Sequence, residues 1–121
     1  MNKENEPIHI GNAEDIDKGS VENFEYDEID YAIYHIEGGF FATQGHCNCE
    51  EQALFSEGAI DGEELECPSC SRTYSIVSGD AISDPEALPL KIYDITEEDG
   101  KLYLNIEIYF FFINNIIYIQ S

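Results

Sequence analysis

The four cysteines of this chain lie close together, as a Cys-x-Cys pair and a Cys-x-x-Cys pair. Cys47 and Cys49 form the first pair, Cys67 and Cys70 form the second, and 17 residues separate the two pairs. Four thiols in this pattern can ligate a metal ion, hold an iron–sulfur cluster or form disulfides. Because a reducing cytosol disfavours structural disulfides, the pattern favours metal binding or redox chemistry. A fold for this chain must therefore bring two separate loops to one point.

Length and composition limit the size of that fold. The chain has 121 residues, of which 43% are hydrophobic, so it can bury one modest core. The N-terminal residues lack the apolar run of a secretory signal, and no stretch reaches the roughly 18 to 20 uninterrupted apolar residues of a membrane span. The sequence therefore predicts a cytoplasmic protein that does not associate with a membrane.

The charge balance is strongly acidic. The chain carries 26 Asp and Glu residues against five Lys and Arg residues, which gives a net charge of −21. Phosphate backbones would be repelled, so the composition excludes nucleic acid as a partner. Two interpretations of the charge stay open: a solvated surface that keeps the protein soluble, or a docking face for a partner with a basic surface.

The hydrophobic pattern predicts an all-β fold. Short apolar runs alternate with turns rich in Gly, Asp and Glu. A helical period occurs only at residues 13–17, where we expect at most one helical turn with Asn12 as its cap. Strands are expected at residues 7–10, 21–26, 30–36, 40–43, 73–79, 90–98 and 101–108.

The turn residues predict how some of these strands are joined. Gly38-Gly39 and Asp99-Gly100 each indicate a tight two-residue hairpin turn. The two prolines within residues 85–89 indicate an extended connection, because proline cannot donate to a sheet ladder.

Several motifs around the cysteines occur in a fixed order. "FATQG" at residues 41–45 precedes the first cysteine pair, and "ALFSEG" at residues 53–58 follows it. Cys67 is followed by a proline, and Tyr74 supplies an aromatic residue soon after the second pair. In these features, over residues 7–107, the sequence resembles the Rieske-type ferredoxins, small electron carriers that serve ring-hydroxylating and related oxygenases.

The resemblance implies a fold and a cofactor. Family members have small antiparallel sheets and a two-loop subdomain that holds a [2Fe-2S] cluster through Cys-x-His and Cys-x-x-His. Here cysteine stands at both histidine positions, Cys49 and Cys70. The resemblance implies that Cys47 and Cys67 bind the inner iron and that the other two cysteines bind the outer iron, where electrons leave. Four thiolates are the ordinary ligands of plant-type [2Fe-2S] clusters.

The same resemblance implies a function. It predicts a one-electron carrier between a reductase and an oxygenase-like acceptor. The acidic charge of the chain adds the hypothesis that both partners present basic docking surfaces. No nucleophile stands beside a base and no phosphate-binding loop occurs in the sequence, so we expect a carrier and not an enzyme. Two departures from the family pattern affect the loops: the segment between Cys49 and Gly58 is slightly long, and Ser71 stands where a glycine is usual.

An alternative stays open at this point. Cys-Pro-x-Cys is also the knuckle of zinc ribbons and rubredoxins, so the four cysteines could hold one structural zinc or a mononuclear iron. The protein would then be a redox-inert binding or scaffold module. His46 adjoins Cys47, but neighbouring residues in an extended segment point in opposite directions. We therefore expect His46 to lie outside the first coordination sphere, and the pattern alone does not decide whether it contributes to the site.

The sequence divides into a Rieske-like domain at residues 1–107 and an apolar C-terminal extension at residues 108–121. The extension is rich in Ile, Phe and Tyr and is interrupted by two asparagines. Three hypotheses account for it: extra strands joined by an Asn-Asn hairpin, an interface for self-association or an oxygenase, or a disordered appendage.

Overall fold

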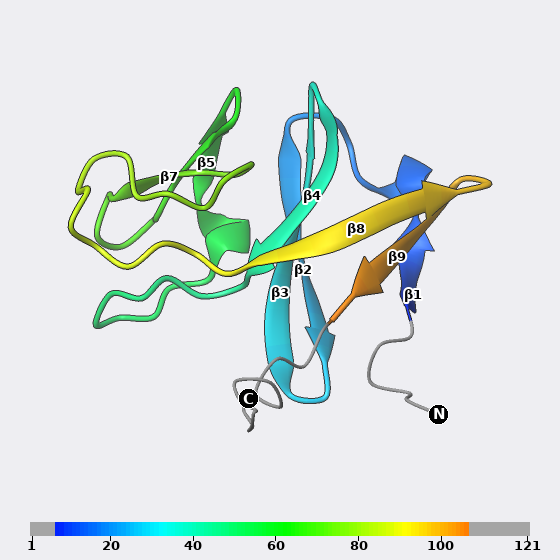
Figure 1. The fold of residues 1–121 in the computed structure, drawn as a ribbon, viewed down its shortest axis with the longest axis horizontal. Coiled ribbons are helices and arrows are strands. Elements are labelled where there is room, and N and C mark those ends of the chain that lie inside the picture. Colours follow the sequence, from blue (N-terminus) through cyan, green and yellow to red (C-terminus); the bar gives the residue numbers. More distant parts are fainter. Residues whose placement is uncertain (1–6, 107–121) are drawn as a thin grey trace, which may run out of the picture.

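The computed structural model describes residues 7 to 106 of the chain (Figure 1). The predicted domain boundary at residue 107 and the apolar extension at 108–121 lie outside these residues. The described strands are β1 (Ile8–Asn12), β2 (Ser20–Tyr26), β3 (Ile29–Ile36), β4 (Gly39–Gln44), β5 (Ala59–Asp61), β6 (Glu64–Glu66), β7 (Thr73–Ser75), β8 (Ile92–Glu98) and β9 (Lys101–Asn105). Two short 3₁₀ helices, η2 (Ala13–Asp15) and η3 (Phe55–Glu57), complete the elements.

The strands form two antiparallel sheets. The larger sheet has the order β1-β9-β8-β4-β3-β2, and the smaller one has the order β5-β6-β7. Figure 1 shows the small sheet to one side of the large sheet, and the chain between residues 45 and 91 lies mostly on that side. The all-β prediction is therefore confirmed. Within residues 7 to 106 no helix has the length and apolar character needed to span a membrane.

Two of the predicted connections are found where the sequence placed them. Asp99 and Gly100 join β8 to β9 with φ angles of 54° and 79°, the pair of positive values that a type I′ hairpin turn requires. The proline-containing segment at 85–89 lies outside every strand and links the small sheet to β8.

Two local predictions were wrong in detail. Gly39 pairs with Ile36 across the β3–β4 hairpin, so the turn consists of Glu37 and Gly38 and not of the two glycines. Gly39 adopts a φ of 130°, which favours glycine at the first position of β4. Asn12 makes no side-chain cap at η2; it is the last residue of β1 and pairs with Lys101 of β9.

The small sheet was the part that the hydrophobic pattern described least well. The strand predicted at 73–79 is limited to residues 73–75, because the chain turns back and the N–H of Gly79 donates to the carbonyl of Ser75 at 2.8 Å. Strands β5 and β6 were not predicted. With three residues each they are too short to show a period.

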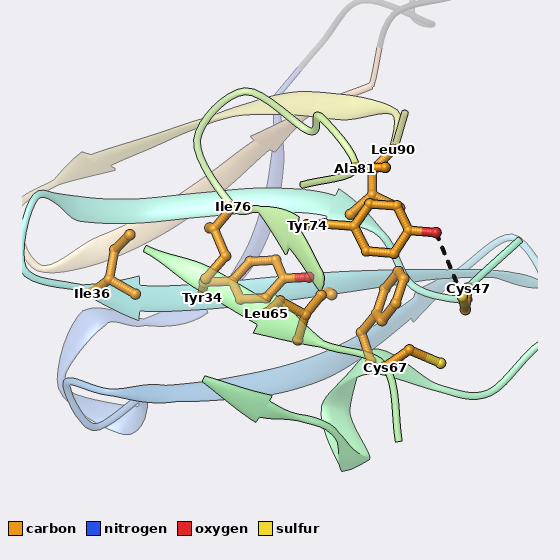
Figure 2. Packing of buried hydrophobic residues seen from close by; sticks show 11 residues of the cluster. Tyr34, Ile36, Cys47, Leu65, Cys67, Tyr74, Ile76, Ala81 and Leu90 are labelled. Carbon is orange, nitrogen blue, oxygen red and sulfur yellow. Dashed lines mark hydrogen bonds between the residues drawn. The ribbon is translucent and has the colours of Figure 1, made fainter. Parts of the chain in front are cut away.

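Strand β3 is buried on both faces and separates two cores. Tyr31 and Ile33 point into a core shared with Ala42 and Leu104. The other face of β3 packs against a second core, which we call the loop core. Its buried members are Ala32, Tyr34, Ile36, Cys47, Phe55, Leu65, Cys67, Tyr74, Ile76, Ala81 and Leu90 (Figure 2). Both cores therefore depend on the side chains of residues 30–36, which point alternately to the two faces of the strand.

A buried pair of hydroxyl groups lies beside the loop core. Tyr34 and Thr43 have hydroxyl oxygens 2.9 Å apart, and the Thr43 hydroxyl donates to the carbonyl of Gln44 at 2.7 Å. The Thr43 oxygen therefore accepts the hydrogen of the Tyr34 phenol. Burial raises the pKa of Tyr34, so the phenol stays neutral and serves as a donor. Thr43 lies in the "FATQG" motif, and this hydrogen bond is a structural reason for a threonine at that position of the motif.

We predict that the small sheet folds as part of the main core and not as an independent appendage. Leu65 in β6 is fully buried in the loop core, so Leu65→Ala should lower the free energy of unfolding by about 2–5 kcal/mol. Leu88, which is 71% exposed, provides the matched control, and Leu88→Ala should change stability by no more than about 0.5 kcal/mol. Urea unfolding measures both. Equal effects of the two substitutions would contradict the shared core.

Candidate metal centre

The four cysteines predicted as ligands are brought together in one cluster. The Sγ atoms of Cys47, Cys49, Cys67 and Cys70 all lie within 4.8 Å of one another. Two sulfur contacts cross between the two loops: 3.7 Å from Cys47 to Cys70, and 4.0 Å from Cys49 to Cys67. Each pair of the sequence motif therefore contributes to a single sulfur site.

The first loop leaves the end of β4 and carries Cys47 and Cys49. Its base is closed by two backbone hydrogen bonds, from the Cys47 N–H to the Ala53 carbonyl and from the Phe55 N–H to the Gly45 carbonyl, both at 2.9 Å. Phe55 follows the loop and is fully buried in the loop core. The loop is thus anchored at both ends by strand-like pairing and by an aromatic side chain.

The second loop connects β6 to β7 and carries Cys67 and Cys70. The Cys67 N–H donates to the Arg72 carbonyl at 2.9 Å, and the Ser71 N–H donates to the Cys67 carbonyl at 3.1 Å. Within the loop, the N–H groups of Ser69 and Cys70 point at the Cys67 sulfur, at 3.4 and 3.5 Å. Hydrogen bonds to a sulfur that ligates a metal tune the electronic properties of the site.

The sulfur site runs from the core to the surface. Cys47 and Cys67 are buried, Cys49 is half-buried and Cys70 is exposed. Burial raises the pKa of the Cys47 thiol to about 12. Burial also opposes ionisation of Cys49, but backbone N–H groups within residues 51–53 and the Cys47 thiol outweigh it, so the pKa of Cys49 falls to about 6. The first loop therefore presents one protected and one readily ionised sulfur.

Two side chains outside the cysteine set contact the buried part of the site. The Tyr74 phenol oxygen lies 3.7 Å from the Cys47 sulfur (Figure 2). Arg72 donates to the same phenol oxygen at 3.2 Å. The sequence had indicated Tyr74 by its position in the motif, but Arg72 carried no signal that distinguished it from an exposed basic residue.

Gln44 is a further residue that sequence reasoning missed. Its amide nitrogen donates to the His46 carbonyl at 2.7 Å and to the Asn48 side-chain oxygen at 3.0 Å. Its amide oxygen accepts from the Lys91 N–H at 2.8 Å. Gln44 therefore ties the first loop to the start of β8. Only its position in "FATQG" could have suggested this role, because a single glutamine has no periodic signature.

His46 lies outside the cysteine cluster. Its Nε2 atom is 3.5 Å from a carboxylate oxygen of Asp30, and its side chain is 43% exposed. The backbone of His46 bridges to Leu54 across the base of the first loop. These contacts agree with the expectation that an extended segment turns His46 away from its neighbour Cys47.

Two positions near the cysteines have a local geometry that favours glycine. A Cβ atom at Gly58 would collide with the carbonyl oxygen of Glu66, so the turn after the first loop has no room for a side chain. Ser71, where the family usually has glycine, adopts a φ of 65° in the left-handed region. A non-glycine residue is strained in that conformation, so this departure from the family pattern costs stability but leaves the loop geometry accessible.

A comparison with protein families identifies the class of this fold and site. Residues 6–94 match the family model described as the Rieske [2Fe-2S] domain. The chain belongs to the Rieske [2Fe-2S] domain family.

Curated relatives place the chain among the ferredoxins of that family. It is 30% identical, over 82% of its length and 93% of the relative's, to the 3-phenylpropionate/cinnamic acid dioxygenase ferredoxin subunit of Photorhabdus laumondii. It is 31% identical, over 71% of its length and 79% of the relative's, to the biphenyl dioxygenase ferredoxin subunit of a Pseudomonas species. These relatives are redox carrier components, and the expectation that the chain is not an enzyme is confirmed by them.

Solved structures agree with the sequence comparison. The fold superposes on a chain of the complex of reduced oxygenase and oxidized ferredoxin in carbazole 1,9a-dioxygenase with a TM-score of 0.77, at 25% identity, covering 84% of this chain and 94% of that one. It superposes on the ferredoxin of Sphingomonas yanoikuyae with a TM-score of 0.75, also at 25% identity, covering 83% of this chain and 98% of that one. The predicted Rieske-like architecture is therefore confirmed.

The cofactor of this family is a [2Fe-2S] cluster, and the family match supports the same cofactor here. The residues present fit it in their chemistry, because four thiolates are the ordinary ligands of such a cluster.

The strained serine generates a prediction about the second loop. Ser71→Gly should raise the free energy of unfolding by about 0.5–1 kcal/mol, because release of the left-handed strain exceeds the added entropy of glycine in the unfolded chain. Ser69→Gly, the same change two residues away at a position without positive φ, should be neutral or destabilising. Urea unfolding compares them. A loss of stability in Ser71→Gly would show that the serine is not strained.

Proposed function

We propose that this chain is a cytoplasmic one-electron carrier that accepts electrons from a reductase and passes them to an oxygenase or a similar acceptor. The observation that carries the proposal is the convergence of four thiol sulfurs within 4.8 Å in a Rieske [2Fe-2S] domain. The relatives support it, because their names describe ferredoxin components of dioxygenase systems. A reducing cytoplasm would keep the thiols available for the cluster.

In this proposal cysteine replaces both histidine ligands of the family, and all four cysteines hold the cluster. The burial of Cys47 and Cys67 supports their assignment to the inner iron. The exposure of Cys70 and the half-burial of Cys49 support the outer iron for these two. When bound, the cluster supplies reversible one-electron chemistry. The protein excludes water from the inner pair, aims N–H donors at the Cys67 sulfur and leaves the outer pair open to a partner.

The surface near the site supports a docking role. Six large hydrophobic residues in the described part of the chain are notably exposed, and four of them lie in the segment from 77 to 92 that follows the second loop: Val77, Ile82, Leu88 and Ile92. Glu50 and Glu51 in the first loop are exposed beside the outer cysteines. Exposed apolar residues and exposed carboxylates in these segments fit a partner whose surface offers both apolar contacts and basic side chains.

A second candidate function is favoured by the compactness of the site. One tetrahedral ion held by four thiolates at about 2.3 Å places the sulfurs about 3.8 Å apart. The two sulfur contacts between the loops, 3.7 and 4.0 Å, match that value. A structural zinc or a mononuclear iron would make the protein a redox-inert Rieske-like scaffold. The family match and the ferredoxin relatives do not favour this candidate, so we place it second.

Metal analysis of anaerobically purified protein tests the proposal. We expect about two iron and two acid-labile sulfide per chain, with a colour that dithionite bleaches. Cys70→Ser should disturb the visible spectrum, whereas His46→Ala should leave metal content and spectrum unchanged, since His46 stands outside the sulfur cluster. One zinc per chain without sulfide would establish the second candidate. Loss of iron in His46→Ala would make the ligand assignment wrong.

The docking proposal predicts that the rate of electron transfer depends on the salt concentration and on which acidic residues are replaced. Electron transfer to a basic partner should slow as ionic strength rises, because the Debye length is only about 10 Å at 0.1 M salt. Replacing Glu50 and Glu51 by lysine should slow the second-order rate at low salt. Replacing Glu97 and Glu98 by lysine makes the same charge change at the far end of β8 and is the control (Figure 1).

Stopped-flow measurement with a reductase or oxygenase component gives these rates. If the two charge reversals slow the reaction equally, or if salt leaves the rate unchanged, the acidic surface serves solubility and not docking.

A further inference from the structure

The only arginine of this strongly acidic chain lies beside the sulfur site. The sequence has five basic residues in all, and Arg72 is the single arginine among them. It lies two residues after Cys70, and its side chain is 26% exposed, so it is held against the protein. Its Nη1 atom donates to the Tyr74 phenol oxygen at 3.2 Å.

The chemistry of arginine determines the direction of the hydrogen bonds in this region. A guanidinium group has donors only, so the Tyr74 oxygen must accept from Arg72. The phenol has a single hydrogen, which is then free to point at the Cys47 sulfur, 3.7 Å away (Figure 2). Arg72, Tyr74 and Cys47 thus form a chain in which every donor points toward the buried sulfur. Hydrogen bonds in such chains polarise one another.

We propose that Arg72 is a positioning residue that raises the reduction potential of the cluster, both by its charge and by polarising the Tyr74 phenol toward the Cys47 sulfur. This inference rests on the proposed function, because it concerns a cluster held by four thiolates. Reduction adds one electron and therefore one negative charge to the site, and no bond is formed or broken. A fixed positive charge and a hydrogen-bond donor both stabilise the reduced state more than the oxidised one.

The need for such a residue follows from the ligand set. Two thiolates in place of two neutral imidazoles add two negative charges, which oppose reduction. The 26 acidic residues of the chain act in the same direction, although water screens most of them. Arg72 is thus a cation next to a site where the ligands and the acidic surface both oppose reduction.

The charge of Asp84 partly cancels the effect of Arg72 on the reduction potential. Replacing Asp84 should therefore shift the potential in the opposite direction to replacing Arg72. Its carboxylate oxygen lies 3.8 Å from Nη2 of Arg72, and its side chain is about half exposed. This ion pair holds the guanidinium in place and partly neutralises it. Asp84→Asn should therefore raise the potential, because it removes a negative charge and leaves a hydrogen-bond acceptor for the guanidinium.

Protein-film voltammetry on the iron–sulfur protein tests the proposal. We expect Arg72→Gln to lower the equilibrium constant for reduction about tenfold, which is about 59 mV for a one-electron couple. Arg72→Lys should retain more of the wild-type potential than Arg72→Gln, because it keeps the charge and loses the planar fork. Lys101→Gln, at the start of β9, makes the same change in net charge and should leave the potential unchanged.

A double-mutant cycle with Tyr74→Phe separates the two parts of the effect. If Arg72 acts partly through the phenol, the shift caused by Arg72→Gln should be smaller in the Tyr74→Phe protein. An unchanged potential in Arg72→Gln, or equal shifts in Arg72→Gln and Lys101→Gln, would overturn the inference. If Arg72→Gln fails to assemble a cluster, Arg72→Lys and Asp84→Asn decide by the signs of their shifts.

Iron and sulfide content, measured on every variant, keeps the two proposals distinguishable. Absence of iron and sulfide from the wild-type protein overturns the proposed function and this inference with it. A complete cluster in all variants with identical potentials overturns the role of Arg72 alone.

Discussion

The site depends on the packing of both cysteine loops against one face of β3. Cys47 and Cys67 are buried in the same core as Tyr34 and Leu65, although they come from loops that belong to different sheets. Interiors of proteins are close-packed, so neither buried sulfur can move without displacing its neighbours. The antiparallel pairing of the small sheet thus positions the second loop, and Phe55 positions the first.

Charge is the second physical constraint on this protein. A surface with few cations repels anions and attracts basic molecules, and Cys70, which the proposed function assigns to the outer iron, is exposed on that surface. Against this acidic background, the one arginine lies near the sulfurs. Arg72 contacts Tyr74 and Asp84, and the contact with Asp84 connects the second loop to the segment that leads to β8.

Much of the fold could be predicted from local patterns, and the errors have physical causes. The long strands with alternating residues and the Asp99-Gly100 turn were recognisable because side chains alternate along a strand and a type I′ turn selects particular residues. The turn at Glu37-Gly38 was misplaced by one residue because two adjacent glycines allow either position. The three-residue strands of the small sheet were missed because their stability comes from tertiary packing.

The sequence by itself determined the ligand candidates and the family, because cysteine spacing, a proline after Cys67 and a few motif residues are local properties. Only the tertiary structure decided which cysteines are buried and which are exposed, that His46 turns toward Asp30, and that Gln44 joins the first loop to β8. Only it showed that Arg72 reaches the Tyr74 phenol. These contacts join residues whose relative position is set by the pairing and packing of the two sheets, and no local pattern encodes such a distance.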